Sequence, residues 1–276
     1  MTDENPGDAA VLARADAIVL AGSRPGGDAM ADSRGIAVKA LIPVAGKAML
    51  AHVTDALLSH SAIGNVHLLA QDFKPFWADS DTQGLAANGR VMVQESGATI
   101  AVSVDALLKR EDARYPLLIT TADNVLLSQE MIADFLNAAT ASDIAIAVVE
   151  KDVLLRRYPA SRRTWLKLRG GHYSGANLFY FGSPQARQIL RYWAEVEQDR
   201  KKGWKILTIF GPWLLFLAVT RMLTVDQLAA RVGRKLGLTI KIVPMTQAEA
   251  CIDVDKEIDL AMVEQIIAAQ TKVADI

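Results

Sequence analysis

A glycine-rich stretch that also carries positive charge stands near the start of the chain, in AIVLAGSRPGGDAMADSRGIAVKALIPVAGKAML. Gly22, Gly26 and Gly27 let backbone N–H groups approach phosphate oxygens without hindrance from a Cβ atom. Arg24 and Lys39 can supply positive charge to the same ligand. The stretch lacks both the Gly-x-Gly-x-x-Gly spacing of dinucleotide sites and the Gly-Lys-Ser/Thr ending of a P-loop. Its residue types therefore indicate a small anionic ligand without fixing which one.

The elements that must position this stretch follow a βαβα order. The runs AIVLA and PLLIT are continuously apolar, as expected for parallel strands covered by helices on both faces. We expect an α/β three-layer sandwich with a mostly parallel, Rossmann-like central sheet, in which ligands bind at the carboxyl ends of strands. The predicted strands are Ala17–Ala21, Val66–Leu69, Arg90–Val93, Leu117–Thr120, Ile144–Val149, Asn177–Phe181 and Thr239–Val243. The predicted helices are Lys47–Ser59, Ile100–Lys109, Ser128–Ala139, Pro184–Lys201, Thr224–Leu236 and Lys256–Ala269; QDFKPFWADSDTQG and residues 156–164 are predicted as long loops.

The composition excludes several classes of protein. The 276 residues are 51% hydrophobic and 22% charged, and we expect one domain over residues 1–276 with residues 1–14 flexible. Thirty basic and 31 acidic residues leave a net charge of −1, and no stretch is basic enough to follow a nucleic-acid backbone. The start, MTDENPGDAA, is unlike a secretory signal, and the only cysteine, Cys251, cannot form an internal disulfide. We therefore expect a cytoplasmic protein that does not bind nucleic acid.

One strongly apolar segment, Ile206–Val219, follows the basic sequence RKKGWK. A membrane span needs about 20 apolar residues. This segment is shorter and is interrupted by Gly211 and Pro212, so we expect no transmembrane helix. In one interpretation the segment is a buried helix or a homodimer contact, with Trp213 and Phe216 on one buried helical face. In the other it makes a peripheral contact with a bilayer or binds a lipid-linked substrate.

The glycine-rich stretch resembles the opening of the nucleotidyltransferase superfamily, which includes molybdenum-cofactor guanylyltransferases, methylerythritol-phosphate cytidylyltransferases and sugar-phosphate nucleotidylyltransferases. The family pattern is a strand ending Leu-Ala-Gly/Ala-Gly, a loop with an arginine, Lys-x-Leu, and a Gly-Lys/Arg-Pro-Leu helix start. This chain shows VLAGSRPGG and then KALIPVAGKAML. One family glycine is missing beside Gly22 and the loop is longer, so either Arg24 or Arg34 takes the phosphate-binding role. The resemblance implies nucleotide binding by Leu20, Ala21, Gly22, Ser23, Arg24 and Lys39.

Two later segments resemble the acidic motifs of the same superfamily. PLLITTADNVLLSQEMI looks like its strand-end motif, which implies that Asp123 coordinates Mg²⁺ and contributes to nucleotide binding. CIDVDKEIDLAMVEQI resembles the late Asp-x-Asp-Thr-Pro-Glu-Asp-Leu element, which implies that Asp255, with Asp253 beside it, completes the metal site. Residues two apart on a strand share a face, so both carboxylates reach one ion. Taken alone, Asp123 would fit a helix cap or turn equally well.

Two further segments resemble substrate-binding parts of the superfamily. ESGATIAVSVDALL is similar to the cytidylyltransferase segment that frames the base and ribose, which implies that Gly97, Thr99 and Ser103 bind nucleotide. Otherwise this segment is an ordinary amphipathic helix with Ser103 exposed. GGHYSGANLFYF resembles the acceptor-side strand, which implies acceptor binding by Gly175 and Asn177.

The resemblance implies the nucleotide-diphospho-sugar transferase type of fold and a Mg²⁺-dependent nucleotidyltransferase. Such an enzyme joins a nucleoside monophosphate from a triphosphate, with GTP or CTP favoured, to a phosphorylated small-molecule or lipid-linked acceptor and releases pyrophosphate. Lys39, Arg24 and Asp123 would be its catalytic residues. One alternative is a GT-A-like glycosyltransferase that uses a nucleotide-sugar and holds its metal through Asp253 and Asp255. The other is a nucleotide-binding protein without catalytic activity.

Overall fold

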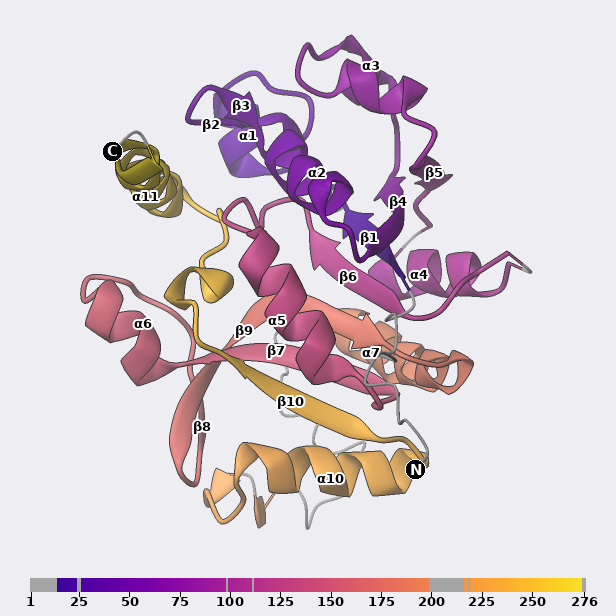
Figure 1. Ribbon diagram of the computed structural model, residues 1–276, viewed down its shortest axis with the longest axis vertical. Helices are drawn as coiled ribbons and strands as arrows, with labels where there is room; N and C mark the ends of the chain where they lie inside the picture. The colour runs from indigo at the N-terminus through magenta and orange to yellow at the C-terminus, as the bar shows by residue number, and fades with distance from the viewer. Residues whose placement is uncertain are drawn as a thin grey trace, which may run out of the picture.

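The computed structural model describes residues 14–23, 26–97, 99–110, 112–198, 216–217 and 219–274. An eight-stranded sheet runs through it in the order β10-β7-β9-β6-β1-β4-β5, with β8 paired to β9 beside this path (Figure 1). The strands are β1 (Ala15–Leu20), β4 (Ile63–Ala70), β5 (Val91–Glu95), β6 (Leu117–Thr121), β7 (Ile144–Glu150), β8 (Leu166–Leu168), β9 (Gly171–Phe181) and β10 (Ile240–Met245).

Most neighbouring strands of the sheet are parallel. β1 pairs in parallel with β4 on one side and with β6 on the other, and β4 with β5 and β7 with β10 are also parallel. β9 is the exception, because it runs antiparallel to β6, β7 and β8. The mostly parallel central sheet expected from the continuous apolar runs is confirmed.

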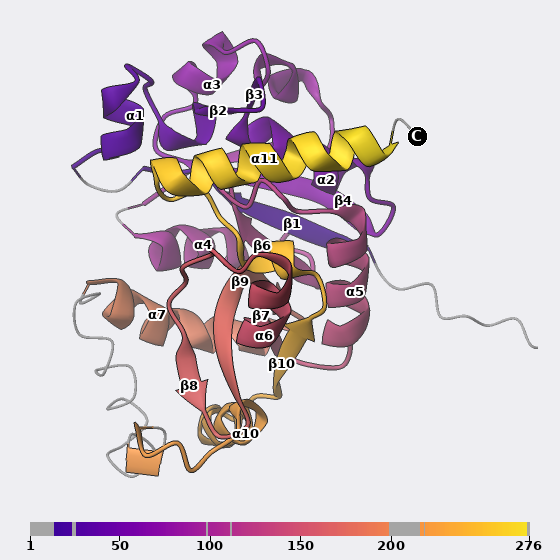
Figure 2. The same cartoon turned by 90° about the vertical axis from the view of Figure 1, so that its left-hand side faces the viewer.

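Helices cover both faces of the sheet, which gives three layers (Figures 1 and 2). Along β1 the side chains alternate: Ala17 and Val19 belong to one buried cluster and Ile18 to the other. The first cluster includes residues of α2 (Met49–Ser59), α5 (Gln129–Ala139) and α11 (Glu257–Ala274). The second includes residues of α4 (Ile100–Leu108), α7 (Ile189–Gln198) and α10 (Val225–Leu236).

Several short elements differ from the sequence-based expectations. The expected helix start at Lys47 is wrong, because β2 (Pro43–Val44) and β3 (Lys47–Ala48) form a hairpin whose turn places Ala45 and Gly46 at positive φ. The expected loop QDFKPFWADSDTQG contains α3 (Lys74–Ala78) and the start of η2 (Gln83–Ala87), anchored by the buried ring of Phe76. The remaining short elements are α1 (Ala29–Ser33), η1 (Lys39–Leu41), α6 (Lys151–Arg157), η3 (Pro184–Gln188) and η5 (Ala248–Cys251).

The apolar segment Ile206–Val219 lies mostly outside the described residues, as do Trp213 and residues 1–13. Phe216 is described and is 51% exposed, so it is not buried within the chain, whereas its burial against a second subunit stays a prediction. Within the described ranges, no helix combines the length and the apolar character that crossing a membrane requires.

Candidate active site

The candidate site lies where two adjacent parallel strands end. β1 and β6 are neighbours, and the chain leaves β1 toward β4 on one side and returns at β6 on the other. Such a reversal of strand order opens a crevice beyond the carboxyl ends of the strands, where ligands of open α/β sheets bind. Residues 21–23 follow β1 and residues 122–124 follow β6, so both segments reach this crevice.

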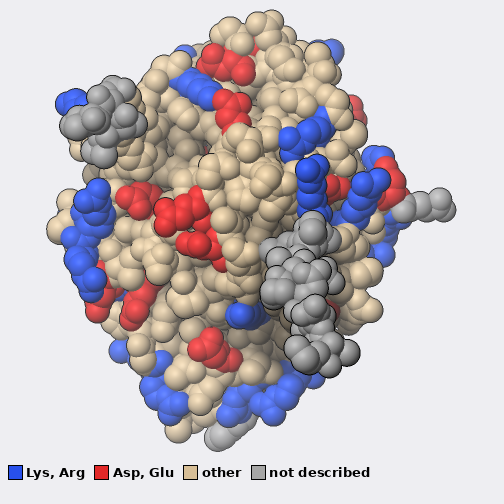
Figure 3. All heavy atoms as spheres, in the orientation of Figure 1, with Lys and Arg blue, Asp and Glu red and all other residues tan. Residues whose placement is uncertain are grey.

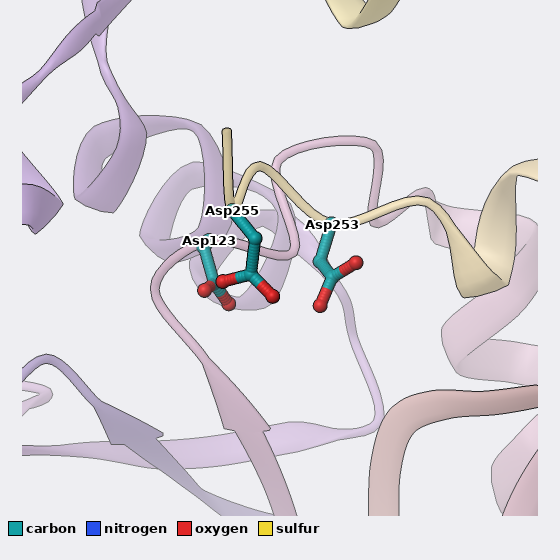
Figure 4. Close-up of side chains that lie close together, drawn as sticks. All are labelled: Asp123, Asp253 and Asp255. Carbon is teal, nitrogen blue, oxygen red and sulfur yellow. The ribbon is translucent and has the colours of Figure 1, made fainter. Parts of the chain in front are cut away.

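Three aspartates meet at this edge of the sheet, and Figure 4 shows their carboxylates turned toward the same space. One oxygen from each of Asp123, Asp253 and Asp255 lies within 4.8 Å of the others. The expectation that the last two stand on a strand is wrong, because they lie in the segment that joins η5 to α11. This segment alternates as a strand would, with Ile252 and Val254 buried, and Val254 N–H donates to the carbonyl oxygen of Asp123 at 3.1 Å.

Lys39 is the cation that contacts two of these carboxylates. Its Nζ donates to Asp123 Oδ2 at 2.6 Å and to Asp255 Oδ1 at 2.7 Å, and its side chain is 18% exposed. Burial opposes the charged ammonium group, but the charges and hydrogen bonds of Asp123 and Asp255 outweigh burial and raise the pKa of Lys39. The lysine is therefore held charged, in contact with two of the three carboxylates.

Asp253 has different partners. Arg163 donates to its Oδ1 and, at 3.2 Å, to its carbonyl oxygen, while Asn177 Nδ2 donates to its Oδ2 at 3.0 Å. Burial and the charges of Asp123 and Asp255 raise the pKa of Asp253, against the opposing effect of Arg163. Sequence reasoning missed Arg163, which lies in the loop after α6 and shows no spacing that links it to the acidic motif.

The donor set and charge fit a hard divalent cation. Carboxylate oxygens are the ligands that Mg²⁺ prefers. Arg163 also lies near Asp259, with Nη2 and Oδ1 3.7 Å apart. Four carboxylates thus face two cationic side chains in this network, which leaves two negative charges for a divalent ion to neutralise.

An irregularity in β9 aims Asn177 at the cluster. Ile146 pairs with Phe179 and Val148 pairs with Gly175, so β9 has two more residues than β7 between these pairs. Asn177 lies in this bulge at φ 48°, a left-handed conformation that asparagine tolerates better than most residues. Bulges next to active sites commonly redirect a side chain. Gly175 is exposed and does not line the pocket described below.

The loop after β1 is held by a residue that sequence reasoning also missed. Gln71 follows β4; its Oε1 accepts from Ser23 N–H at 2.8 Å and its Nε2 donates to Ser23 O at 3.0 Å. A Cβ atom at Gly22 would lie 2.9 Å from the Gln71 amide, so glycine permits this close approach. Gln71 follows a neighbouring parallel strand, which is the only sequence signal that places it here.

The segment before α4 is ordered by its own polar groups. Thr99 caps the helix by accepting from Val102 N–H at 3.2 Å. Ser103 Oγ donates to Thr99 O at 2.7 Å and accepts from Gly97 N–H at 2.9 Å. Ser103 is 2% exposed, so the alternative of an ordinary helix with an exposed serine is wrong. Thr99 and Ser103 therefore shape the wall of the pocket.

These segments enclose a pocket of about 280 Å³. Arg24 lies outside the described residues, and Arg34, which does not line the pocket, forms an ion pair with Glu257 at the start of α11. The sequence-predicted residues that line the pocket are Leu20, Ala21, Gly22, Ser23, Lys39, Gly97, Thr99, Ser103, Asp123, Asn177, Asp253 and Asp255.

Comparison with known proteins shows the fold and the family of the chain. Among solved structures, a hypothetical transferase from Thermus thermophilus is 26% identical, with a TM-score of 0.73 over 90% of this chain and 99% of that one. A 4-diphosphocytidyl-2C-methyl-D-erythritol synthase from Anaerococcus prevotii shares the fold, at 11% identity and a TM-score of 0.54 over 93% of this chain and 97% of that one. The 2-C-methyl-D-erythritol 4-phosphate cytidylyltransferase from Thermus thermophilus also shares the fold. It is 17% identical, with a TM-score of 0.51 over 91% of this chain and 98% of that one.

A search of curated proteins found no match. The family model described as the MobA-like NTP transferase domain matches residues 17–209, which is more than half of the chain and begins within β1. The resemblance seen in the opening motif is thereby confirmed. The chain belongs to the MobA-like NTP transferase family and is a nucleotidyltransferase.

Proposed function

We propose that the protein transfers a nucleoside monophosphate from a nucleoside triphosphate to a phosphorylated acceptor, with Mg²⁺, and releases pyrophosphate. The observation that carries this proposal is the meeting of Gly22, Ser23, Lys39 and three aspartates in one pocket. Two anions must approach each other in this reaction, and the departing pyrophosphate gains negative charge as the bond breaks. A site for it must therefore combine phosphate donors with a cation site.

The residues have separate roles in this proposal. Lys39, with Arg24 from the opening loop, neutralises the triphosphate, and the backbone N–H groups of the loop bind its oxygens. Asp123, Asp255 and Asp253 hold the metal, which would stabilise the developing charge on the phosphate oxygens. The acceptor phosphate is already ionised at neutral pH, so no general base is needed.

A covalent intermediate on cysteine has no support in the described residues. Cys251 is the only cysteine of the chain, and it is buried. Burial raises the pKa of its thiol to about 12, which leaves almost no reactive thiolate at neutral pH. Direct attack by the acceptor phosphate is the mechanism that the site supports.

We assign different parts of the pocket lining to the two substrates. Gly97, Thr99 and Ser103 shape one wall, which we assign to the base and ribose, and we assign Asn177, which donates to Asp253, and the nearby Gly175 to the acceptor. We propose GTP or CTP as the donor and a phosphorylated small molecule or a lipid-linked phosphate as the acceptor.

Pyrophosphate release tests this function. The protein should release pyrophosphate from GTP or CTP only with a divalent metal and a phosphorylated acceptor, tested with a panel of sugar, polyol and polyprenyl phosphates. Asp123→Asn serves as the inactive control. Release of a nucleoside diphosphate from a nucleotide-sugar would instead indicate the glycosyltransferase, and binding without turnover across the panel would indicate the non-catalytic alternative.

A further inference from the structure

Lys39 occupies a position that a metal ion between Asp123 and Asp255 would need. Its ammonium group lies within 2.7 Å of a carboxylate oxygen of each aspartate. Asp123 and Asp255 are two of the three aspartates that form the acidic cluster. A divalent ion placed between the same oxygens would face a positive charge at close range. The ammonium and the metal therefore compete for one pair of carboxylates.

The same lysine lines the pocket beside the loop that would bind the triphosphate. It begins η1, and its ammonium stands on a flexible four-carbon stem, so it can change partners without movement of the backbone. Gly22 and Ser23 line the same pocket, which places phosphate-binding groups among its neighbours. Lys39 thus has two sets of anions available, the carboxylates and the phosphates of a bound nucleotide.

We propose that Lys39 serves as the resident cation of Asp123 and Asp255 before substrate binds, and that it moves to the triphosphate when the metal–nucleotide complex takes its place. This inference rests on the proposed function, because it requires a metal-bound triphosphate. The exchange keeps a cation beside Asp123 and Asp255 in both states. It also makes metal and nucleotide bind together, since each removes an obstacle to the other.

The proposal predicts effects of opposite sign for a single substitution. Lys39→Met removes the competitor, so Mn²⁺ alone, measured by electron paramagnetic resonance without nucleotide, should bind at least about fivefold more tightly than to the wild type. The same variant should bind a triphosphate more weakly in EDTA, measured by calorimetry. A lysine with only a structural role would not tighten metal binding.

Control variants test whether a change in Mn²⁺ affinity comes from the charge of Lys39. Lys47→Met removes an exposed lysine that pairs with Asp55 and should leave Mn²⁺ binding unchanged. Lys39→Arg keeps a cation and should retain the wild-type affinity. Adding Asp123→Asn to Lys39→Met should abolish the gain. Lys39→Gln, which keeps a hydrogen-bond donor, replaces Lys39→Met if circular dichroism shows that the methionine variant is unfolded.

Mn²⁺ binding that is unchanged or weaker in both Lys39→Met and Lys39→Gln would overturn the exchange, even if pyrophosphate release confirms the proposed function. Tighter Mn²⁺ binding together with no pyrophosphate release from any triphosphate would support the resident-cation role and contradict the proposed function instead. The metal measurement uses no nucleotide, so the two outcomes are independent.

Discussion

Asp123 and Asp255 share Lys39, whereas Asp253 is bound by Arg163 and Asn177. Under the proposed exchange, Asp123 and Asp255 are the carboxylates that become available to metal when Lys39 moves. We expect Asp123→Asn and Asp255→Asn to keep the fold and to lower turnover at least about 100-fold, because the amide loses the charge that holds a catalytic ion.

Steady-state turnover at saturating Mg²⁺, with circular dichroism of each variant, measures this loss. Asp55→Asn is the matched control, since that exposed carboxylate pairs only with Lys47 among the described contacts. Full Mg²⁺-dependent activity in either cluster variant would contradict a shared metal site.

The ion pair between Arg163 and Asp253 leads to a prediction about stability. The Arg163 side chain is 11% exposed and its partner Asp253 is 21% exposed, so removal of Arg163 leaves a largely buried carboxylate without its cation. We expect Arg163→Met to lower the free energy of unfolding by about 2–4 kcal/mol, near the range for breaking a buried ion pair. Urea denaturation measures the change.

Arg110→Met provides the comparison, because Arg110 and Asp112 form an exposed pair, 53% and 69% accessible. Exposed pairs contribute little to stability, because water and salt screen their charges. An equal loss of unfolding free energy from the two substitutions would show that Arg163 stabilises the fold no more than an exposed ion pair does.

The sequence predicts residues with a local signature and misses those without one. Lys39, Asp123 and Asp255 lie in motifs beside strand or helix ends, and all three line the pocket. Arg163 and Gln71 act on side chains or backbone 90 and 48 residues away, respectively. Nothing in their own neighbourhoods indicates these contacts, since they depend on which loops the fold brings together.

At the scale of elements, the bulge in β9 determines where Asn177 points. The residue has φ 48°, so an alanine there would be strained as well as deprived of the hydrogen bond to Asp253. We expect Asn177→Ala to lower the free energy of unfolding by about 1–3 kcal/mol. Asn177→Gly should lower it less, because glycine adopts positive φ readily.

Both variants should lower turnover, because both lose the amide that binds Asp253. Urea denaturation and turnover assays separate the two effects. Equal stability of the alanine and glycine variants would mean that the bulge carries no backbone strain.

The sequence predicts a strand well when the burial of its own apolar residues makes it a strand. It fails when the strand depends on hydrogen bonds to neighbouring strands. The apolar runs of β1 and β6 indicate strands covered on both faces, and the predicted bounds of each strand lie within two residues of the observed ones. The predicted strand Asn177–Phe181 covers only the apolar end of β9. The first part of β9 is a strand because β8 and β7 supply hydrogen-bond partners, which the sequence of β9 does not reveal.

At the scale of the whole molecule, positive charge gathers over α10 at one end, as Figure 3 shows. Phe216, Val219 and Met222 are 51%, 68% and 53% exposed just before this helix. Exposed basic residues of the same stretch are Arg221, Arg231, Arg234 and Lys235. Apolar side chains beside basic ones favour an anionic bilayer surface.

We therefore expect the protein to float with anionic liposomes at low salt and to be released as salt screens the charges. The double variant Arg234→Glu, Lys235→Glu should lose this binding, whereas Lys74→Glu on α3, at the other end in Figure 1, should not. Absence of flotation at low salt would favour core packing or a subunit contact for residues 206–219.

The site as a whole joins distant parts of the chain. Gly22 and Lys39 come from its start, Asp123 from its middle and Asp253 and Asp255 from near its end. The parallel α/β pattern predicts that segments after β1 and β6 meet. It does not predict the path of residues 252–256, which is fixed by burial of Ile252 and Val254 and by the hydrogen bond from Val254 to Asp123.

Because the ligand would connect these segments, it should stabilise the whole fold. A ligand at 100 times its dissociation constant adds about 2.7 kcal/mol to the stability of the state that binds it. For a chain of this size that corresponds to a rise in Tm of roughly 5–10 °C. Thermal denaturation with each of the four triphosphates and Mg²⁺ should give the largest rise with GTP or CTP. EDTA should remove most of that rise, since the site then lacks the divalent cation that offsets its excess of negative charge. An equal rise for all four triphosphates, or one that survives EDTA, would contradict a base-selective, metal-dependent site.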